Sequence, residues 1–242
     1  MRAPHVIRSE SSDKRELVAR TRKRFFQVGV HLLILAAALF LSSWHWDWLM
    51  AWAFLGVSGG VILFGGIRLL RVNPELVAER SQMGEDTKGW DKVLTRLYGL
   101  MGLATLVIAG LDARFGWSGG IPLSVQLVAL VLFAIGNLLA FWAMWSNVFF
   151  ATTVRIQGER GHAVATGGPY RYVRHPGYSG WLVCNIVPPL ILDSLWAFVP
   201  AVLTVLIIII RTAAEDRALR EELPGYAEYA ASVRYRFVPG IW

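Results

Sequence analysis

Residues 123–145 read LSVQLVALVLFAIGNLLAFWAMW, an almost uninterrupted apolar run that contains no charged residue. A membrane-spanning helix needs about 20 mostly apolar residues, so this run predicts one crossing of a bilayer. The whole chain, 242 residues long, is 55% hydrophobic and only 17% charged, which is too apolar for an ordinary soluble domain. The sequence therefore predicts an all-α polytopic membrane protein.

Further apolar runs lie on both sides of this one, and each predicts a helix. The upstream runs are Phe25–Leu41, Trp48–Leu70 and Leu97–Leu111, and the downstream runs are Trp181–Leu192 and Leu195–Ile210. Pro188-Pro189 and Asp193-Ser194 interrupt the downstream pair, which therefore predicts a tilted or bent helical hairpin. The chain is expected to have five or six transmembrane helices, four of them within residues 25–145.

Positive charge predicts the orientation of these helices. Of the 24 Lys and Arg residues, all except Arg114 fall on one side of the membrane if the number of crossings is even. The positive-inside rule places that side, with both termini, in the cytoplasm. We expect an integral protein of a bacterial-type cytoplasmic membrane, whose net charge of +7 suits anionic lipid headgroups. No nucleic-acid motif accompanies that charge, so nucleic acid is not an expected partner.

A single membrane domain over residues 1–242 is expected, because no repeat or low-complexity linker divides the chain. Residues 1–24 form a basic N-terminal arm, expected to be a surface helix or a disordered segment on the headgroups. Between the second and third spans, Asn73–Lys92 predicts a short helix that starts after Pro74. Cys184 is the only cysteine, which excludes an internal disulfide and a cysteine metal cluster.

Residues 167–178 read GGPYRYVRHPGY, a polar, aromatic and cationic segment between apolar runs. This composition predicts the lining of a binding site at the membrane surface. Each tyrosine alone is equally typical of the aromatic belt at a membrane interface. The chain has five histidines without an HExxH motif, so no metal site is expected. Gly167-Gly168 lacks the spacing of a dinucleotide-binding or phosphate-binding loop.

Arg211 and Glu215 lie four residues apart at the end of the last apolar run, which places them on one face of a helix. Two interpretations stay open. The pair can form an ordinary ion pair within the helix, or the two groups can face a ligand that carries both charges. Residues 211–223 predict a cytoplasmic helix that Pro224-Gly225 ends, and the segment beyond it is expected to fold back as a lid.

The C-terminal third carries a series of short motifs in a fixed order. They are His162-x-Val164, Gly168-Pro169-Tyr170, Arg174-His175-Pro176-Gly177-Tyr178-x-Gly180, Arg211-x-x-x-Glu215-Asp216-x-x-Leu219 and Tyr226-x-x-Tyr229. In order and spacing this region resembles the isoprenylcysteine carboxyl methyltransferase (ICMT) family, and the wider group that includes phospholipid methyltransferases. Asn73-Pro74-Glu75-Leu76 and Trp90-Asp91-Lys92 add a weaker resemblance to bacterial-type members. The family has Glu-Glu where this chain has Glu215-Asp216, which leaves a role for Asp216 in doubt.

The resemblance implies a membrane methyltransferase that uses S-adenosyl-L-methionine, held in a cytoplasm-facing pocket within residues 157–242. It implies membrane lipids and a lipophilic small molecule or lipidated substrate as partners. The catalytic or substrate contact falls on Arg211. The implied cofactor contacts are Gln157, His162, Ala163, Val164, Ala165, Tyr170, His175, Pro176, Gly177, Tyr178 and Glu215.

The methyl acceptor stays open at this point. A carboxylate acceptor needs no general base, and Arg211 would orient it by a charge-assisted, single or bidentate, hydrogen bond. A phospholipid amine would need a base, and a small thiol also remains an alternative.

Two other functions compete with methyl transfer. NADPH-dependent sterol-type membrane reductases resemble the same half of the chain. They usually have His-Pro-Asn-Tyr followed by Gly-Glu, where this chain has Gly177 and Trp181. A non-enzymatic protein that binds lipid headgroups through its basic loops is the third hypothesis.

Overall fold

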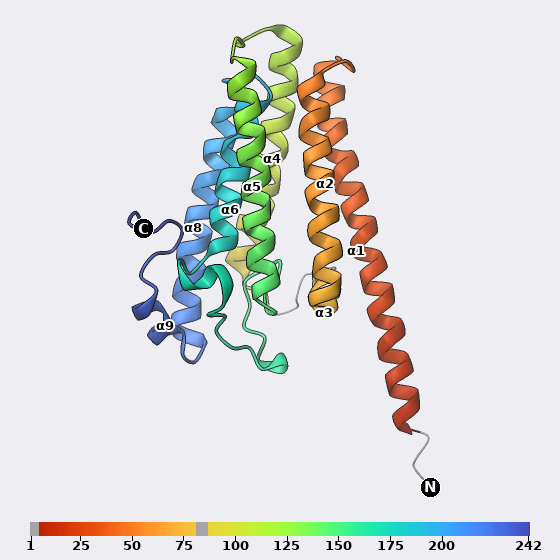
Figure 1. Cartoon of the computed structure of the whole chain (residues 1–242), viewed down its shortest axis with the longest axis vertical. Coiled ribbons are helices and arrows are strands. Elements are labelled where there is room, and N and C mark those ends of the chain that lie inside the picture. Colours follow the sequence, from red (N-terminus) through yellow and green to blue (C-terminus); the bar gives the residue numbers. More distant parts are fainter. Residues whose placement is uncertain (1–4, 81–86) are drawn as a thin grey trace.

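The computed structural model describes residues 5–80 and 87–242, and these residues form helices and loops without a strand. Within these described residues, five helices are long and apolar enough to cross a membrane. They are residues Val18–Ser43 of α1 (His5–Ser43), α2 (Leu49–Val72), α4 (Gly89–Phe115), α5 (Leu123–Ser146) and α8 (Phe198–Glu222). Figure 1 shows them as one elongated bundle. The predicted all-α polytopic membrane fold is confirmed.

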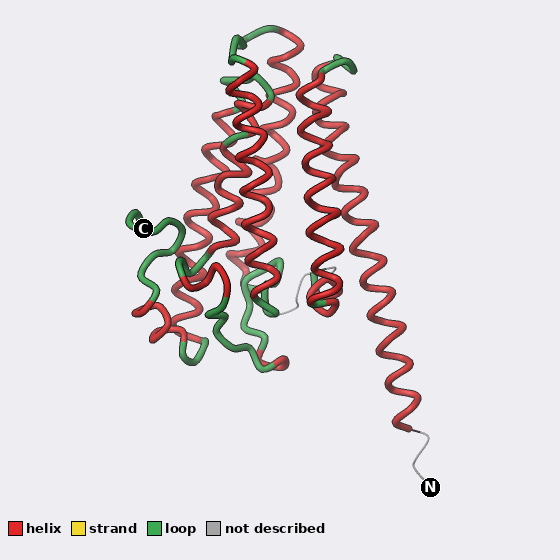
Figure 2. The backbone as a smooth tube through the Cα atoms, viewed as in Figure 1, coloured by secondary structure: helices red, strands yellow, loops and turns green. Residues whose placement is uncertain are grey.

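Shorter elements complete the described part of the chain. They are α3 (Pro74–Glu79), α6 (Pro176–Ile186), α7 (Pro188–Ile191), α9 (Tyr226–Ser232) and the 3-10 turns η1 (Gly158–Arg160) and η2 (Gly168–Arg171). Figure 2 shows that the loops gather at the two ends of the bundle, with the longest loops at the end that carries α9.

The basic N-terminal segment differs from the expectation of a separate surface element. From His5 onward it is continuous with the first membrane helix, and α1 extends past the rest of the bundle (Figure 1). The physical reason is local, since no proline or glycine interrupts the sequence between His5 and Gly29. Residues 1–4 lie outside the described residues.

The predicted bent hairpin is formed by α6, α7 and α8. Val187 separates α6 from α7, which begins with Pro188-Pro189, and a turn at Asp193, with a φ of 54°, leads toward α8. At this turn Asp193 Oδ1 accepts a 2.7 Å hydrogen bond from the Ile121 amide. The Ser194 hydroxyl donates to Asp112 Oδ2 at 2.5 Å, beside the loop between α4 and α5. The α6–α7 segment therefore runs the length of the bundle, and α8 returns (Figure 1).

The bundle core lies between α1, α2, α4, α5 and α7. Its largest buried side chains include Leu39, Phe40, Phe54, Leu106, Phe133 and Ile191. Many large apolar side chains stay exposed on the outer faces of the same helices, among them Leu33, Leu49, Leu63, Val131 and Val199. Outward apolar side chains around a helical bundle suit contact with lipid, which supports an integral membrane protein.

The short helix predicted after Pro74 is α3. Asn73 caps it, since its Oδ1 accepts a 3.1 Å hydrogen bond from the Leu76 amide. Leu76 and Val77 are buried against α2 and α5 residues. This packing places Arg80, just past the helix, so that its Nη1 donates to the Phe150 carbonyl at 3.2 Å. The helix thus supports the loop that follows α5.

Glycine allows α5 and α6 to touch. A Cβ atom on Gly136 would lie 2.8 Å from the Gly180 carbonyl oxygen, and a Cβ on Gly180 would collide with the Gly136 carbonyl. Close backbone approach at small residues is a common way to join membrane helices. The N-terminal half of α6, which carries several of the predicted site residues, is fixed against α5 in this manner.

Gly180→Ala is expected to destabilise the protein by about 1–3 kcal/mol, because two helix backbones must separate to admit one methyl group. Thermal unfolding in detergent measures this loss as a lower Tm. The matched control is Gly99→Ala on α4, where a new Cβ meets no atom within 4 Å. Equal Tm values for the two variants would contradict the close contact.

Candidate functional site

A cavity opens at the end of the bundle that carries α9. The empty space inside it, open solvent at the mouth included, is about 800 Å³. Its wall is built by the loop after α5, the 162–165 segment, η2, the start of α6, the last turns of α8, and α9. Sequence segments that are far apart therefore meet here.

Most residues expected at the site line this cavity. They are His162, Ala163, Val164, Ala165, Tyr170, His175, Gly177, Tyr178, Arg211 and Glu215. Gly177 has a specific reason to lack a side chain, since a Cβ there would lie 2.6 Å from Phe150 Cζ. The Phe150 ring can therefore stand against α6 and form part of the wall.

Gln157 and Pro176 do not line the cavity. Gln157 is fully buried, and its Nε2 donates to the Phe149 carbonyl at 2.8 Å while its Oε1 accepts from Arg160 Nη1 at 2.6 Å. It fixes the loop behind the cavity wall. Pro176 is the first residue of α6, a position where the missing amide hydrogen costs nothing. Both residues shape the site from outside.

Other lining residues were not expected from the sequence. They are Asn147, Phe149, Phe150, Ala151, Thr153, Val154, Arg155, Trp181, Leu219 and Leu223, whereas Arg174 belongs to the segment 167–178 predicted to line a site, and Tyr226 and Tyr229 come from the expected lid. The residues at 147–155 directly follow the last apolar run before the GGPYRYVRHPGY segment. Their position in the sequence could have indicated that they lie near the site, but residues 147–155 form no recognisable motif.

Arg211 and Glu215 do not pair with each other. Arg211 Nε donates to Asp91 Oδ1 at 2.6 Å, and its Nη2 donates to Asp91 Oδ2 at 3.2 Å. Glu215 Oε2 instead accepts a 2.6 Å hydrogen bond from the Tyr178 hydroxyl. The simple ion pair within the helix is therefore wrong, and two opposite charges on one helix face the same cavity.

Each of these two groups keeps one atom without a protein partner in the described part of the chain. For Arg211 it is Nη1, because Nη2 also donates to the Thr152 carbonyl at 3.0 Å. For Glu215 it is Oε1. Both residues line the cavity, so the site offers a hydrogen-bond donor with positive charge and an acceptor with negative charge.

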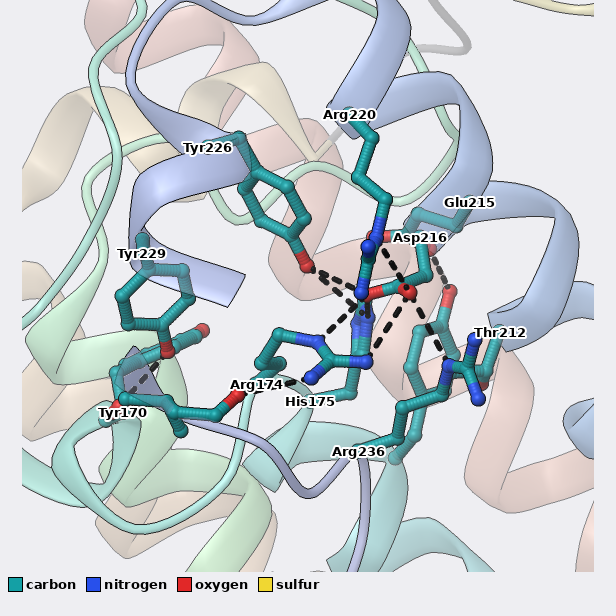
Figure 3. Close-up of polar contacts among 12 residues, drawn as sticks. Tyr170, Arg174, His175, Thr212, Glu215, Asp216, Arg220, Tyr226, Tyr229 and Arg236 are labelled. Atoms are coloured by element: carbon teal, nitrogen blue, oxygen red, sulfur yellow. Dashed lines mark hydrogen bonds and ion pairs between the residues drawn. The ribbon is translucent and has the colours of Figure 1, made fainter. Parts of the chain in front are cut away.

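Asp216, in doubt from the sequence, is the centre of a polar cluster beside the cavity. Arg174 donates two hydrogen bonds to its carboxylate, from Nε to Oδ1 at 2.8 Å and from Nη2 to Oδ2 at 3.1 Å. The Tyr226 hydroxyl donates to Oδ1 at 2.9 Å, and Arg236 Nε donates to Oδ2 at 3.1 Å. Figure 3 shows these side chains, with Arg220, converging on the carboxylate.

His175 belongs to the same cluster. Its Nε2 lies 3.2 Å from Asp216 Oδ1, and an ionised carboxylate only accepts hydrogen bonds, so Nε2 carries the proton. This leaves Nδ1 as the remaining polar atom of a side chain that lines the cavity.

The C-terminal segment is hydrogen-bonded to the two residues that precede α6. The Arg174 amide donates to the Tyr235 carbonyl and the His175 amide to the Arg236 carbonyl, both at 2.9 Å. Arg174 Nη1 also donates to the carbonyls of Val233 and Arg234. These contacts make the segment after α9 part of the site's framework.

Buried phenol groups of η2 and α9 form another part of the wall. The Tyr229 hydroxyl donates to the Tyr170 carbonyl at 2.7 Å, and Asn147 Nδ2 donates to the Tyr170 hydroxyl at 3.2 Å. Burial raises the pKa of Tyr170, Tyr226 and Tyr229 above the ordinary tyrosine value. All three hydroxyls therefore stay protonated and act as donors at neutral pH.

Comparison with known proteins supports the resemblance found in the sequence. Residues 127–221 match the model of the isoprenylcysteine carboxyl methyltransferase (ICMT) family. Two curated rice proteins, from Oryza sativa subsp. indica and subsp. japonica, are each named probable protein-S-isoprenylcysteine O-methyltransferase. Each is 40% identical over 60 residues, which is 24% of this chain and 31% of the relative. The match thus spans about a third of these relatives.

The fold is also shared with a solved structure, described as the eukaryotic intramembrane Ras methyltransferase ICMT without a monobody. The two structures superpose with a TM-score of 0.52 over 96% of this chain and 85% of the other, at 16% sequence identity. The predicted resemblance to the ICMT family is confirmed.

Asp216→Asn should destabilise the site by about 3–5 kcal/mol, because it leaves the buried Arg174 guanidinium without its counter-charge. The expected result is a lower Tm and faster proteolytic cleavage after α9, where Arg174 holds the chain. Glu221→Gln, an exposed carboxylate on the same helix, is the control. Cleavage at the same rate in both variants would contradict a structural role for the cluster.

Proposed function

We propose that this protein transfers a methyl group from S-adenosyl-L-methionine to the carboxylate of a lipophilic, isoprenylcysteine-like substrate at the cytoplasmic membrane face. One observation carries the proposal. Arg211 and Glu215 line one cavity, and Arg211 Nη1 and Glu215 Oε1 are each without a protein partner in the described residues. The match to the ICMT family model over residues 127–221 supports the reaction class.

The residues present fit the methyl donor. Its adenine needs an apolar and aromatic surface, which Tyr170, Tyr229 and Phe149 supply. Its amino-acid end carries both charges, and Glu215 Oε1 suits the ammonium group or the ribose hydroxyls. The Tyr170 hydroxyl, which accepts from Asn147 Nδ2 and keeps its own hydrogen, and the backbone amides of the wall suit its carboxylate. When bound, S-adenosyl-L-methionine supplies a methyl group that is already activated on a sulfonium.

Arg211 is proposed to hold the acceptor. Its Nε and Nη2 hydrogens are already committed to Asp91 and Thr152, so Nη1 alone remains for a ligand. A single nitrogen binds one carboxylate oxygen by a charge-assisted bond and leaves the lone pairs of the other oxygen free. That free oxygen is the nucleophile, and of the two contacts weighed from the sequence, single and bidentate, the single one fits this arrangement.

The transfer itself needs alignment more than acid–base chemistry. Bound S-adenosyl-L-methionine would supply the methyl group and its sulfur would keep the electron pair of the carbon–sulfur bond, so Arg211 would have to hold the acceptor carboxylate with one oxygen in line with that methyl group. No proton moves, so no general base is needed. The protein's part is to place two reactants in line and to keep water out, and holding two reactants in reactive geometry accounts for several kcal/mol of rate enhancement.

The proposed orientation follows from the position of the cavity. The cavity lies at the same end of the bundle as the loops rich in Lys and Arg, whereas Arg114 is near the opposite end. By the positive-inside rule the cavity end faces the cytoplasm, with both termini. Membrane lipids surround the helices, and the acceptor enters from the bilayer.

Glu215→Gln is expected to weaken S-adenosyl-L-methionine binding by about 1.5–3 kcal/mol, the usual contribution of a hydrogen bond to a charged group. Calorimetry on the purified protein measures this as roughly a 10- to 100-fold higher Kd. Glu221→Gln is the matched control, and NADPH should produce no heat with any variant. NADPH binding in place of S-adenosyl-L-methionine would favour the reductase hypothesis, and binding of neither cofactor would favour a non-enzymatic lipid-binding protein. Unchanged affinity in Glu215→Gln would contradict the role of Glu215.

Arg211→Gln should abolish the preference for a charged acceptor. Wild-type protein in lipid nanodiscs is expected to bind N-acetyl-S-farnesyl-cysteine roughly 10- to 100-fold more tightly than its carboxamide, because only the carboxylate gains a charge-assisted bond. The variant should bind both equally, with the Kd for the methyl donor changed by less than about threefold. Parallel loss of donor and acceptor binding would contradict this division of roles, and methylation of a phospholipid amine would identify a different acceptor.

A further inference from the structure

Asp91 is a fully buried carboxylate at the start of α4, and the sequence assigns it no role. It is 0% exposed, yet it lies at the cavity end of the bundle next to Arg211. The two residues are 120 positions apart in the chain. A charge at this depth is stable only when it is paired and hydrogen-bonded, so its partners define what it does.

Those partners are few and well placed. Oδ1 accepts from Arg211 Nε at 2.6 Å, and Oδ2 accepts from Arg211 Nη2 at 3.2 Å. Oδ2 also accepts from the Val154 amide at 2.8 Å, and Val154 lines the cavity. One carboxylate therefore ties α4, α8 and the cavity wall together.

The two-point contact has a geometric consequence for the guanidinium. This group is planar, so the two hydrogen bonds from Nε and Nη2 to Asp91 fix both its plane and its rotation about the side-chain axis. The Thr152 carbonyl, 3.0 Å from Nη2, accepts the second hydrogen of that nitrogen, which lies on the edge shared with Nη1. The remaining corner, Nη1, is then held in one direction.

We propose that Asp91 is a positioning residue, which fixes the Arg211 guanidinium so that Nη1 alone is presented to the carboxylate of the acceptor. This role rests on the proposed function, since it concerns the acceptor of the same reaction. Through Val154, Asp91 also sets the distance between the acceptor group and the wall of the donor cavity. Asp91 itself does not touch either reactant.

A purely structural role is the alternative, in which Asp91 only joins α4 to α8. Asp112 provides the matched control, because it lies on the same helix and is 1% exposed. Its carboxylate accepts from Ser118 and Ser194 at the opposite end of the bundle. Asp112→Asn should lower the Tm at unchanged turnover, as expected for a structural carboxylate remote from the cavity.

The test compares Asp91→Asn, Arg211→Lys and the double variant in nanodiscs, with N-acetyl-S-farnesyl-cysteine as acceptor. Asn keeps the size of Asp but cannot accept from both Nε and Nη2 as a carboxylate does. Asp91→Asn is expected to lower kcat/KM for this acceptor about 10- to 100-fold, as misplacement of a substrate-positioning group does. Calorimetry should show the Kd of S-adenosyl-L-methionine changed by less than about threefold.

The double variant shows whether Asp91 acts through Arg211. Lysine has no planar guanidinium that Asp91 could orient. In the Arg211→Lys background, Asp91→Asn should therefore lower kcat/KM only slightly further. Strongly non-additive effects of this kind identify residues that work as a unit. If the fold-changes in kcat/KM of the two single variants multiply in the double variant instead, Asp91 does not act through Arg211 and the proposal is overturned.

The remaining outcomes are also decisive. Wild-type kcat/KM in Asp91→Asn, with methyl transfer intact in the wild type, overturns the positioning role and leaves the proposed function standing. Absence of methyl transfer by the wild type overturns the proposed function, and this role with it. If Asp91→Asn does not fold, Asp91→Glu replaces it, because its extra methylene moves the guanidinium while keeping the charge. The same fall in kcat/KM supports the proposal, and no fall overturns it.

Discussion

A carboxylate that is 1% exposed must have its charge balanced inside the protein, and the partners of Asp216 join the parts of the site. Arg174 comes from the segment before α6, Tyr226 from α9 and Arg236 from the C-terminal segment. Loss of any one bond would leave a buried charge or donor less well satisfied. The constraint therefore holds three separate pieces of chain around the last turns of α8, beside the cavity that Arg174 and Tyr226 help to line.

Three charged residues of α8 have different tasks because they point in different directions. Asp216 faces the structural cluster, while Arg211 and Glu215, one turn apart, face the cavity. The cavity-facing pair avoids mutual neutralisation because each has another partner, Asp91 for Arg211 and Tyr178 for Glu215. A direct ion pair would have used the atoms that a ligand needs. The buried partners thus preserve the binding capacity of Arg211 and Glu215 on this helix.

Much of the fold was predictable, since lipid burial demands apolar runs long enough to span a bilayer and each such run became a helix. The prolines of the hairpin also predicted its bend correctly. The site was predictable where short motifs lie close together, as for His175, Gly177 and Tyr178. Asp91 was not, because pairing with Arg211 depends on the packing of α4 against α8 and has no local sequence signal. The partners of Asp216 were missed for the same reason.

The position of the cavity is energetically favourable for binding an acceptor with a long apolar tail. Moving such a tail from a bilayer into water costs about 0.8 kcal/mol per CH₂ group, whereas one hydrogen bond to a charged group contributes about 1.5–3 kcal/mol. A single contact such as that of Arg211 Nη1 could not compensate for extracting even a short prenyl chain. An enzyme for such an acceptor must therefore bring its site to the membrane. A cavity at the end of a lipid-exposed bundle, with its charged atoms held by buried partners, meets this requirement while the tail stays among lipids.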